Sequence, residues 1–406
     1  MTAGAPAAWK QRSLVATSLL LTACGGGGRS RDPAPVSAIV VAPAPSGPKI
    51  DRAPESTTAT VEPVAPLELA IDETRLCVRV AGRVHCTTTA TPDVALTAPP
   101  PLAGIDDAVS LALGAAFGCA VTRAGKVLCF GDNSYGQLGA QLRTERSDQP
   151  VAVTGLEGAR RVSASEAQAC ALLMDETVRC WGKNDSGQTG GATYYVPAAR
   201  ELVELDVVIG VSGAASIATG GSTTCASKRD RGVMCWGRAP FGDGAMMYSR
   251  KNVRPMAVTE LAAFDAVSAG AGAFCGLEHG EVKCWGELYS LFGGDAARSG
   301  KLVGTGVTRA RKVRVAQTHA CAILTDDSVT CWGMAAYGAL GRGETTAADA
   351  QPAEAVRDLP PAIDIAVGGA ASCAITGARE IYCWGSWPHA GGAMRKEMLP
   401  VKMRLD

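Results

Sequence analysis

The chain has 406 residues, 15 cysteines, and equal numbers of basic and acidic residues, 39 of each. A formal net charge of zero disfavours a basic nucleic-acid-binding protein. A composition with 47% hydrophobic and 19% charged residues excludes wholesale disorder. Fifteen cysteines exceed the number expected of a reduced cytosolic protein, and the odd count requires one cysteine with a separate role.

The N-terminus has the features of an export signal. Lys10 and Arg12 precede the apolar stretch Ser13–Ala23, which is too short to span a bilayer comfortably. It ends in Leu21-Thr22-Ala23-Cys24, which resembles a bacterial lipobox. We therefore expect residues 1–23 to be a lipoprotein signal peptide and Cys24 to be lipidated. The alternative is an ordinary signal peptide followed by a chance cysteine.

A spacer follows the signal. Residues 24–66 are rich in Gly, Pro and Ala and lack a sustained helical or strand period, which predicts a flexible tether. Acyl chains on Cys24 would anchor the protein stably to a membrane. Gly25 after the cysteine favours the outer membrane, by resemblance to the enterobacterial sorting rule. We expect a cell-envelope protein that is periplasmic or surface-exposed.

The remaining cysteines define an internal repeat. They form seven local pairs with eight or nine residues between partners, and the pairs recur every 42 to 55 residues. The pairs are Cys77 with Cys86, Cys119 with Cys129, Cys170 with Cys180, Cys225 with Cys235, Cys275 with Cys284, Cys321 with Cys331, and Cys373 with Cys383.

Each pair brackets a predicted β-hairpin. Ala81-Gly82 and His279-Gly280 would form two-residue loops, and Arg123-Ala124-Gly125 a three-residue loop with Gly125 at a positive φ. These loop lengths place the two cysteines directly opposite each other, within disulfide range. We therefore predict seven disulfides, each inside one hairpin. The alternatives are free buried thiols in a cytosolic protein, or metal ligands, which would favour Cys-x2-Cys spacings that the sequence lacks.

Each repeat holds about four strands. A strand of small residues precedes each hairpin, and proline-led strands such as 149–156 and 254–261 lie further upstream. Seven four-stranded antiparallel sheets predict an all-β, seven-bladed β-propeller over residues 67–406. A linear solenoid would need caps. The C-terminal strand 399–406 is expected to complete the first blade and close the ring, which removes exposed strand edges.

The repeats resemble a known family. CAVTRAGKVLCFGDNSYGQLG (119–139), CWGKNDSGQTGG (180–191) and CWGMAAYGALGRG (331–343) are similar to the regulator of chromosome condensation repeat. The resemblance covers about residues 67–406 and implies a seven-bladed propeller. The paired cysteines look like the exported bacterial branch of that family. Trp-Gly is replaced by Phe130-Gly131 in the second repeat and is missing from the first.

The repeated tryptophans are interpreted as packing residues between blades, with a ligand-binding aromatic ring as the alternative. They are Trp181, Trp236, Trp285, Trp332 and Trp384.

No motif points to catalysis. None of the four histidines is followed four residues later by a metal-ligating residue type, and no nucleophile elbow or phosphate loop appears. We expect no enzymatic activity, no cofactor and no metal. A carboxylate pair contributed by distant loops would be the enzymatic alternative.

The leading hypothesis is a monomeric, non-enzymatic binding scaffold that captures an unidentified protein or a cell-envelope polymer, and no nucleic acid. The longest and most divergent loops, 183–205, 237–256 and 286–308, would carry specificity. The family resemblance offers guanine-nucleotide exchange as an alternative, and inhibition of a secreted enzyme as a form of binding. The candidate contact residues are Tyr194, Tyr195, Phe241, Tyr248, Tyr289 and, on a predicted loop, Trp387.

Overall fold

A computed structural model describes residues 67–72, 75–86, 100–139, 142, 144–191, 205–230, 232–238, 252–258, 264, 266–293, 302–343, 349–388 and 394–403. The chain divides into two units, Met1–Thr60 and Val61–Asp406, and all described residues belong to the second. The predicted signal peptide, Cys24 and nearly all of the predicted tether therefore lie outside the described residues.

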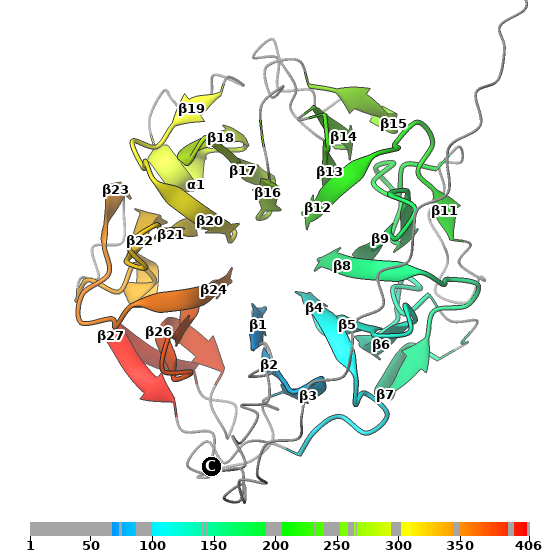
Figure 1. Cartoon of the computed structure of the whole chain (residues 1–406), viewed down its shortest axis with the longest axis horizontal. Coiled ribbons are helices and arrows are strands. Elements are labelled where there is room, and N and C mark those ends of the chain that lie inside the picture. Colours follow the sequence, from blue (N-terminus) through cyan, green and yellow to red (C-terminus); the bar gives the residue numbers. More distant parts are fainter. Residues whose placement is uncertain are drawn as a thin grey trace, which may run out of the picture. The chain divides into compact units, whose positions relative to one another are not determined.

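The second unit is a β-propeller. Seven antiparallel sheets, which we number as blades one to seven in chain order, are arranged in a ring, and the first strand of each blade lies nearest the centre (Figure 1). The predicted all-β, seven-bladed fold is confirmed. Blade one has three strands among the described residues, and each of the other blades has four.

The strands of blades one to four follow one another from the centre outward. They are β1 (Glu68–Ile71), β2 (Leu76–Val80) and β3 (Arg83–Cys86); β4 (Ala108–Gly114), β5 (Phe117–Thr122), β6 (Val127–Asp132) and β7 (Arg146–Ala152); β8 (Ala159–Ser165), β9 (Gln168–Leu173), β10 (Val178–Gly182) and β11 (Asp206–Val207); and β12 (Ala214–Gly220), β13 (Thr223–Lys228), β14 (Val233–Gly237) and β15 (Asn252–Ala257).

Blades five to seven repeat this order, and among the described residues two short helices lie between their strands. The elements are β16 (Ala266–Ala269), β17 (Ala273–Glu278), β18 (Glu281–Gly286), α1 (Tyr289–Phe292) and β19 (Val303–Gly304); β20 (Ala310–Val315), β21 (His319–Leu324), β22 (Val329–Met334), the 3-10 helix η3 (Ala336–Gly338) and β23 (Ala350–Ala355); and β24 (Ala362–Gly368), β25 (Ala370–Thr376), β26 (Ile381–Pro388) and β27 (Met394–Met403).

The central hairpin of each blade forms as its turn sequence predicts. Ala81 and Gly82 have φ values of 50° and 84°, as a two-residue hairpin loop with two left-handed residues requires. In blade two the Thr122 N–H donates to the Lys126 carbonyl at 2.8 Å, which closes the predicted three-residue loop, and Gly125 has a φ of 78°. Both predicted loop types are confirmed.

A bulge that the sequence analysis did not predict follows the second cysteine in four of the blades. There the third strand shifts its register against the fourth, across the aromatic residue that precedes the repeated glycine, and the glycine has a φ between 90° and 107°. The shifts lie between Cys129 and Gly131, Cys235 and Gly237, Cys331 and Gly333, and Cys383 and Gly385. The cysteine spacing fixes only the pairing of the second and third strands, so it carried no information on this irregularity.

The proline-led strands belong to a different blade from the one predicted. Strand β7, which contains Pro150, pairs with β6 of the preceding hairpin and lies at the outer edge of blade two. Pro255 lies in the same way in β15 of blade four. Proline cannot donate a backbone hydrogen bond, so an outer edge strand is where a sheet accommodates it. Each repeat therefore begins at its small-residue strand, one strand later than predicted.

The predicted closure of the ring by the C-terminal strand is wrong. Strand β27 pairs with β26 and forms the outer strand of blade seven, with Cys383 opposite Val401. Only a short connection separates β26 from β27, so pairing within one blade costs less loop-closure entropy than pairing across the ring. Closure instead comes from packing. Leu69 and Ile71 of blade one join a buried core with Ile375 and Ile381 of blade seven.

The hydrophobic cores lie mainly between neighbouring blades. One core combines Phe117 and Val121 of blade two with Val162 and Trp181 of blade three. The five repeated tryptophans are at most 4% exposed, which agrees with the predicted packing role. The Trp181 indole N–H donates to the Gln137 carbonyl of the preceding blade at 2.9 Å, so an indole can also bond across a blade boundary.

Candidate functional site

The strand order defines two faces of the propeller. Because neighbouring strands are antiparallel, the turn between the first and second strands lies on the same face as the connection between the third and fourth. The three divergent connections of the sequence, within 183–205, 237–256 and 286–308, all join third and fourth strands. We call this the long-loop face. The hairpin tips between the second and third strands lie on the opposite face.

The structure describes two of the six predicted contact residues. Tyr289 begins the four-residue helix α1 on the long-loop face, and its side chain is 59% exposed. Trp387 lies in strand β26, opposite Arg395 of β27, and not on a loop as predicted. Strand β26 continues past Trp384-Gly385 to Pro388, whereas the third strands of blades two to six end at or one residue after the equivalent glycine. The remaining four lie outside the described residues: Tyr194, Tyr195, Phe241 and Tyr248.

Two exposed tyrosines that the sequence analysis did not single out lie on the same face. Tyr135 and Tyr337 occupy the equivalent position in blades two and six, directly before the glycine of the Gly-x-Leu-Gly turn. A lysine from the following blade lies over each ring: Lys183 Nζ is 5.4 Å from the Tyr135 centroid, and Lys396 Nζ is 4.7 Å from that of Tyr337. The recurring Tyr-Gly dipeptide was the sequence signal available for finding them.

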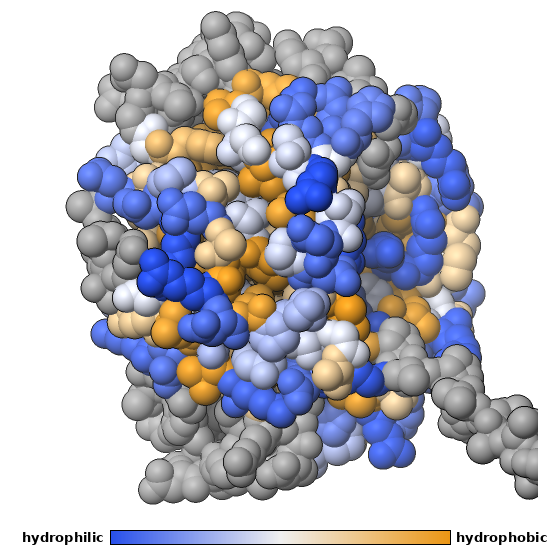
Figure 2. All heavy atoms as spheres, turned by 60° about the vertical axis from the view of Figure 1, so that its left-hand side comes forward, coloured by the Kyte–Doolittle hydropathy of each residue, from blue (hydrophilic) through white to orange (hydrophobic). Residues whose placement is uncertain are grey.

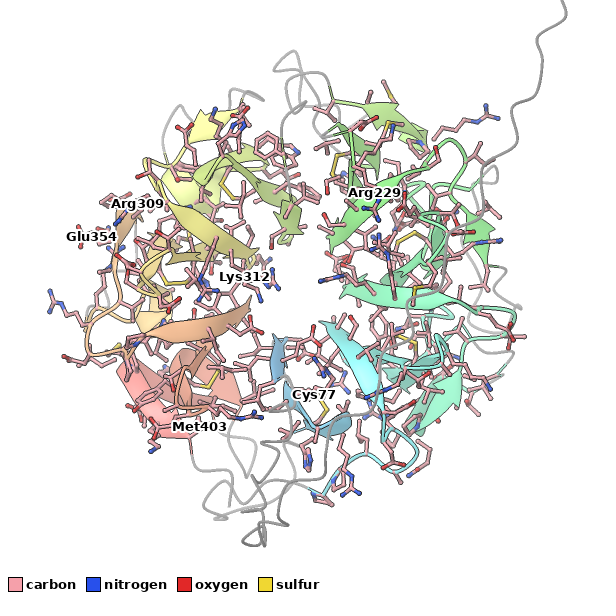
Figure 3. All side chains as sticks on the ribbon, viewed as in Figure 1. Cys77, Arg229, Arg309, Lys312, Glu354 and Met403 are labelled. Carbon is pink, nitrogen blue, oxygen red and sulfur yellow. A yellow bond between two sulfur atoms is a disulfide. The ribbon has the colours of Figure 1, made fainter. Side chains whose placement is uncertain are left out.

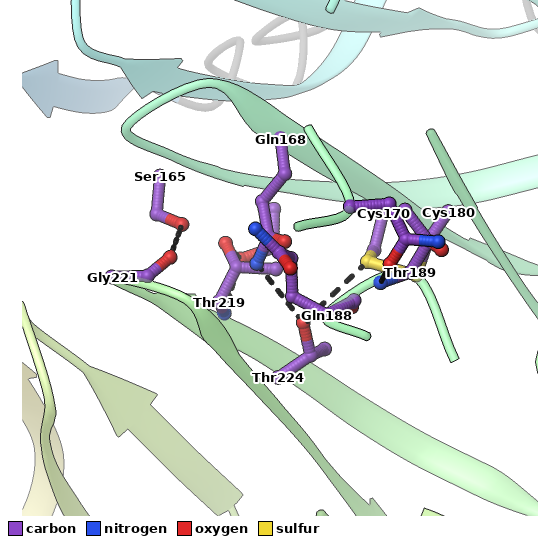
Figure 4. The surroundings of a disulfide bond; sticks show 11 residues. Ser165, Gln168, Cys170, Cys180, Gln188, Thr189, Thr219, Gly221 and Thr224 are labelled. Carbon is purple, nitrogen blue, oxygen red and sulfur yellow. Dashed lines mark hydrogen bonds between the residues drawn. A yellow bond between two sulfur atoms is a disulfide. The ribbon is translucent and has the colours of Figure 1, made fainter. Parts of the chain in front are cut away.

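A buried polar layer joins neighbouring blades beneath this face. In blade three, Gln168 Nε2 donates to Thr224 Oγ1 of blade four at 3.2 Å, and Thr224 donates to the Gln188 carbonyl at 3.2 Å (Figure 4). The same layer between blades six and seven uses His319, whose Nε2 lies 2.8 Å from Ser372 Oγ. Full burial lowers the pKa of His319 to about 4, so this imidazole is neutral at pH 7.

Charged residues also gather on the innermost strands. Lys312 of β20 lies near the centre of the ring and forms an ion pair with Asp364 of β24 (Figure 3). Burial lowers the pKa of Lys312, and repulsion from Arg314 adds to this, while Asp364 opposes it. On β1, Glu68 Oε2 accepts hydrogen bonds from Arg79 Nε at 2.9 Å and from the Leu111 N–H at 3.1 Å. The Lys312–Asp364 pair joins blades six and seven, whereas the Glu68–Arg79 pair lies within blade one and reaches blade two through the Leu111 N–H.

All seven predicted cysteine pairs are joined as disulfides in the structure. The bonds join Cys77 to Cys86, Cys119 to Cys129, Cys170 to Cys180, Cys225 to Cys235, Cys275 to Cys284, Cys321 to Cys331, and Cys373 to Cys383. The partners lie directly opposite across the second and third strands, with Cα atoms 4.0–4.1 Å apart. The cysteines are buried within the blades, as in the blade-three pair (Figure 4). Seven such pairs are typical of a protein from an oxidising compartment.

The described residues hold no cluster of side chains for metal binding. None of their His, Cys, Asp and Glu side chains form a group of three or more that could hold a metal ion. His319 is enclosed and bonded to a serine that itself donates to the Ala339 carbonyl, so the serine is not an activated nucleophile. In this part of the chain, no helix combines the length and the apolar character needed to cross a membrane.

The surface favours mixed polar and aromatic contacts. Figure 2 shows one side of the ring, where hydrophilic side chains predominate and hydrophobic ones are exposed in small groups between them. Exposed tyrosines combine an apolar ring with a hydroxyl, which makes them frequent at protein interfaces. The arrangement can bind a partner through side-chain contacts.

Two overlapping segments of the chain match the sequence models of one repeat family. Residues 108–137 and 124–172 both match the "Regulator of chromosome condensation (RCC1) repeat". They cover blade two and the start of blade three, where the Gly-Gln-Leu-Gly turn is best kept.

Curated proteins are similar to this chain at low identity. Regulator of chromosome condensation from Drosophila melanogaster is 26% identical over 305 residues, which is 70% of this chain and 55% of that protein. "Probable E3 ubiquitin-protein ligase HERC4" from Rattus norvegicus is 28% identical over 212 residues. The chain spans about half of the former and 19% of the latter.

Solved structures show the same fold. Human WBSCR16 superposes with a TM-score of 0.64 at 20% identity, over 78% of this chain and 89% of that one. Prp20p from Saccharomyces cerevisiae gives 0.63 at 16% identity, over 84% of this chain and 86% of that one. At these identities the likeness concerns the propeller alone.

Proposed function

We propose that this chain, which belongs to the regulator of chromosome condensation repeat family, is a non-enzymatic protein-binding scaffold of the exported branch of that family. The observation that carries the proposal is the pairing of all 14 propeller cysteines inside the hairpins of a closed ring. Such a ring fixes, on one face, the strand ends that the long, divergent connections join. Relatives offer precedent, since Prp20p is described with binding properties to Gsp1p and histones.

The proposed location is the cell envelope. Residues 1–23 would be removed, Cys24 would carry the acyl chains, and residues 24–66 would hold the propeller away from the membrane. The paired cysteines support an oxidising compartment and thereby disfavour nucleotide exchange on a cytosolic GTPase. Acceleration of nucleotide release from a small GTPase by the purified chain would contradict the scaffold proposal.

The experiment is crosslinking on whole cells followed by mass spectrometry. Wild-type protein should give a reproducible crosslinked partner, and the partner should be lost when the predicted contact residues Tyr194, Tyr195, Phe241, Tyr248, Tyr289 and Trp387 are changed to alanine. Met174→Ala is the matched control, because Met174 is 65% exposed at a hairpin tip on the opposite face. A partner that survives the contact-residue changes would overturn the assignment of the face.

The same spectra test the compartment and the anchor. We expect seven closed cysteine pairs and an acylated N-terminal Cys24 in the mature chain. Fourteen free thiols in protein from cells would contradict export, and an unmodified N-terminus beyond Cys24 would contradict the anchor.

A further inference from the structure

A cavity of about 570 Å³ opens on the long-loop face where blade six meets blade seven. Gln317 and Thr318 of the turn between β20 and β21 form one side, and Tyr337 of η3 forms another. The other blade contributes Gly369 between β24 and β25, Ala370 at the start of β25, and Ser386 and Lys396 of the paired strands β26 and β27. We call this the Tyr337–Lys396 pocket.

The tyrosine of this pocket is held in place by both blades. Tyr337 has φ 56° and ψ 22°, a left-handed conformation that is strained for a residue with a β-carbon. Gly338 follows it, and a Cβ there would lie 2.7 Å from Met398 Cα of β27. The Gly343 N–H also donates to the Met398 carbonyl at 3.0 Å. The backbone that carries the exposed ring is therefore held against β27, and a strained residue in such a setting is typical of a functional position.

The charge of the pocket is positive. Lys396 is the one charged residue that lines it among the described residues, and no ion pair joins Lys396 to a carboxylate there. Its ammonium lies 4.7 Å from the Tyr337 ring centroid. Gln317, Thr318 and Ser386 add neutral hydrogen-bonding side chains around it. A cation beside neutral donors is complementary to a carboxylate.

The corresponding pair in blades two and three lacks this free charge. Lys183 lies over the Tyr135 ring, but its Nζ is 3.3 Å from Asp185 Oδ2 in the same loop. The two Tyr–Lys pairs share their place in the repeat and differ in whether the lysine is already neutralised. Of the two pairs, the one formed by Tyr337 and Lys396 would therefore attract an anion more strongly.

We propose that the Tyr337–Lys396 pocket binds a carboxylate side chain of an acidic segment of the partner protein. The inference rests on the protein-binding function proposed above and names the chemistry of the partner. A protein segment fits better than an acidic polysaccharide, because the ammonium occupies one face of the tyrosine ring and removes it as a stacking surface for a sugar. Tyrosine is also among the residues that contribute most to binding at protein interfaces.

The test measures peptide binding to the whole purified chain by fluorescence anisotropy. The probes are a labelled glutamate-rich peptide, its twin with glutamine at every glutamate, and an oligogalacturonate. We expect the glutamate peptide to bind about tenfold more tightly than the glutamine twin, as the loss of one charge-assisted contact predicts. Lys396→Ala should remove that difference, and Lys183→Ala should leave it unchanged.

A second variant separates binding from folding. Tyr337→Gly removes the ring and relieves the left-handed strain, so the chain should keep its near-UV circular dichroism and its thermal transition while peptide affinity falls. Three results would contradict carboxylate binding by this pocket. They are equal binding of both peptides, tighter binding of the oligogalacturonate, and an equal loss of affinity in Lys183→Ala.

The whole-cell crosslinks distinguish the two proposals. If they persist unchanged in Lys396→Ala, the pocket proposal is wrong and the scaffold proposal is unaffected. If no partner is crosslinked at all, the scaffold proposal is wrong.

Discussion

Single carbonyl groups in the Gly-x-Leu-Gly turns hold neighbouring blades together. The Ala339 carbonyl of blade six accepts a hydrogen bond from Trp384 Nε1 at 2.9 Å and a second from Ser372 Oγ at 3.1 Å, both from blade seven. All three residues are buried. A buried carbonyl that loses a donor costs about 1–3 kcal/mol, so residue identity at these junctions has a measurable effect.

We predict that Trp384→Phe destabilises the protein more than Trp332→Phe. Both indoles are buried, but Trp332 Nε1 has no hydrogen-bond partner among the described residues, so its replacement loses volume alone. The difference should be about 1 kcal/mol or more, read as a shift in the midpoint of urea unfolding. Equal midpoints for the two variants would show that the bond to Ala339 contributes nothing.

The neutral His319 makes stability depend on pH. Burial lowers its pKa from 6.5 to about 4 in the folded protein, so the unfolded chain binds more protons between these values. The contribution of His319 is therefore complete above pH 6.5 and is lost as the pH falls from 6.5 towards 4. The total is about 3 kcal/mol, an order-of-magnitude figure for a fully buried group.

His319→Gln should flatten that part of the pH profile. Gln168 occupies the matching position of blade three and bonds Thr224 there, so glutamine can keep the contact with Ser372 without titrating. Unfolding free energies of both proteins between pH 4 and 7 measure the effect. A slope that persists unchanged in the variant would assign the pH dependence to other groups.

Some residue-scale features could be read from the sequence and others could not. Burial of the repeated tryptophans followed from their position in each repeat. Phe130, which stands where most repeats have tryptophan, has a contact that could not be predicted from the sequence. The Arg75 guanidinium of blade one lies 5.7 Å from the centroid of its ring, in place of an indole hydrogen bond to the preceding blade. Which residue meets which across a blade boundary depends on the ring geometry, about which a repeat pattern carries no information.

At the scale of elements, the cysteine-bracketed hairpin is the unit that the sequence specifies most fully. Loop length, turn glycines and cysteine spacing all indicate the same register, and the structure has that register in every blade. The assignment of the proline-led strands was wrong by one blade. Alternation and proline content indicate an edge strand, but they do not say which hairpin the strand pairs with.

We predict that removing one disulfide acts within its own blade. Cys275→Ala with Cys284→Ala should lower stability by about 2–3 kcal/mol, because the unfolded hairpin regains loop entropy, plus a small cavity cost. Hydrogen exchange should accelerate in β17 and β18, where these cysteines lie directly opposite. It should stay unchanged in blades two and three. Faster exchange throughout the ring would mean that the disulfides stabilise contacts between blades.

At the scale of the molecule, the ring is closed by close packing between blade one and blade seven. Gly368, at the end of inner strand β24, approaches blade one so closely that a Cβ would lie 2.2 Å from the Ile71 carbonyl oxygen. Gly220 and Gly270 make equivalent approaches to the next blade. The narrow centre of the ring thus requires the small residues that the sequence places in the inner strands. The junction between blades seven and one has the same close approach as the other junctions.

Gly368→Ala should therefore loosen the ring at that junction. The added methyl group must displace backbone, which costs about 1–3 kcal/mol in a packed interior. Gly377→Ala is the matched control, because Gly377 lies at the hairpin tip of the same blade, where an added Cβ would meet no atom within 4 Å and φ is not positive. We expect a lower unfolding midpoint for the first variant and an unchanged or slightly higher one for the second.

The position of the damage distinguishes ring opening from general destabilisation. Opening between blades one and seven should speed hydrogen exchange in β1 and β24, which meet at the closure, before it affects β12 and β13 on the other side of the ring. Uniform acceleration in all four strands would mean that the blades unfold as one cooperative unit and that this junction is no weaker than the rest. Strand β27 pairs inside blade seven and not with blade one, so packing alone closes the ring. We therefore expect exchange to speed up first in β1 and β24.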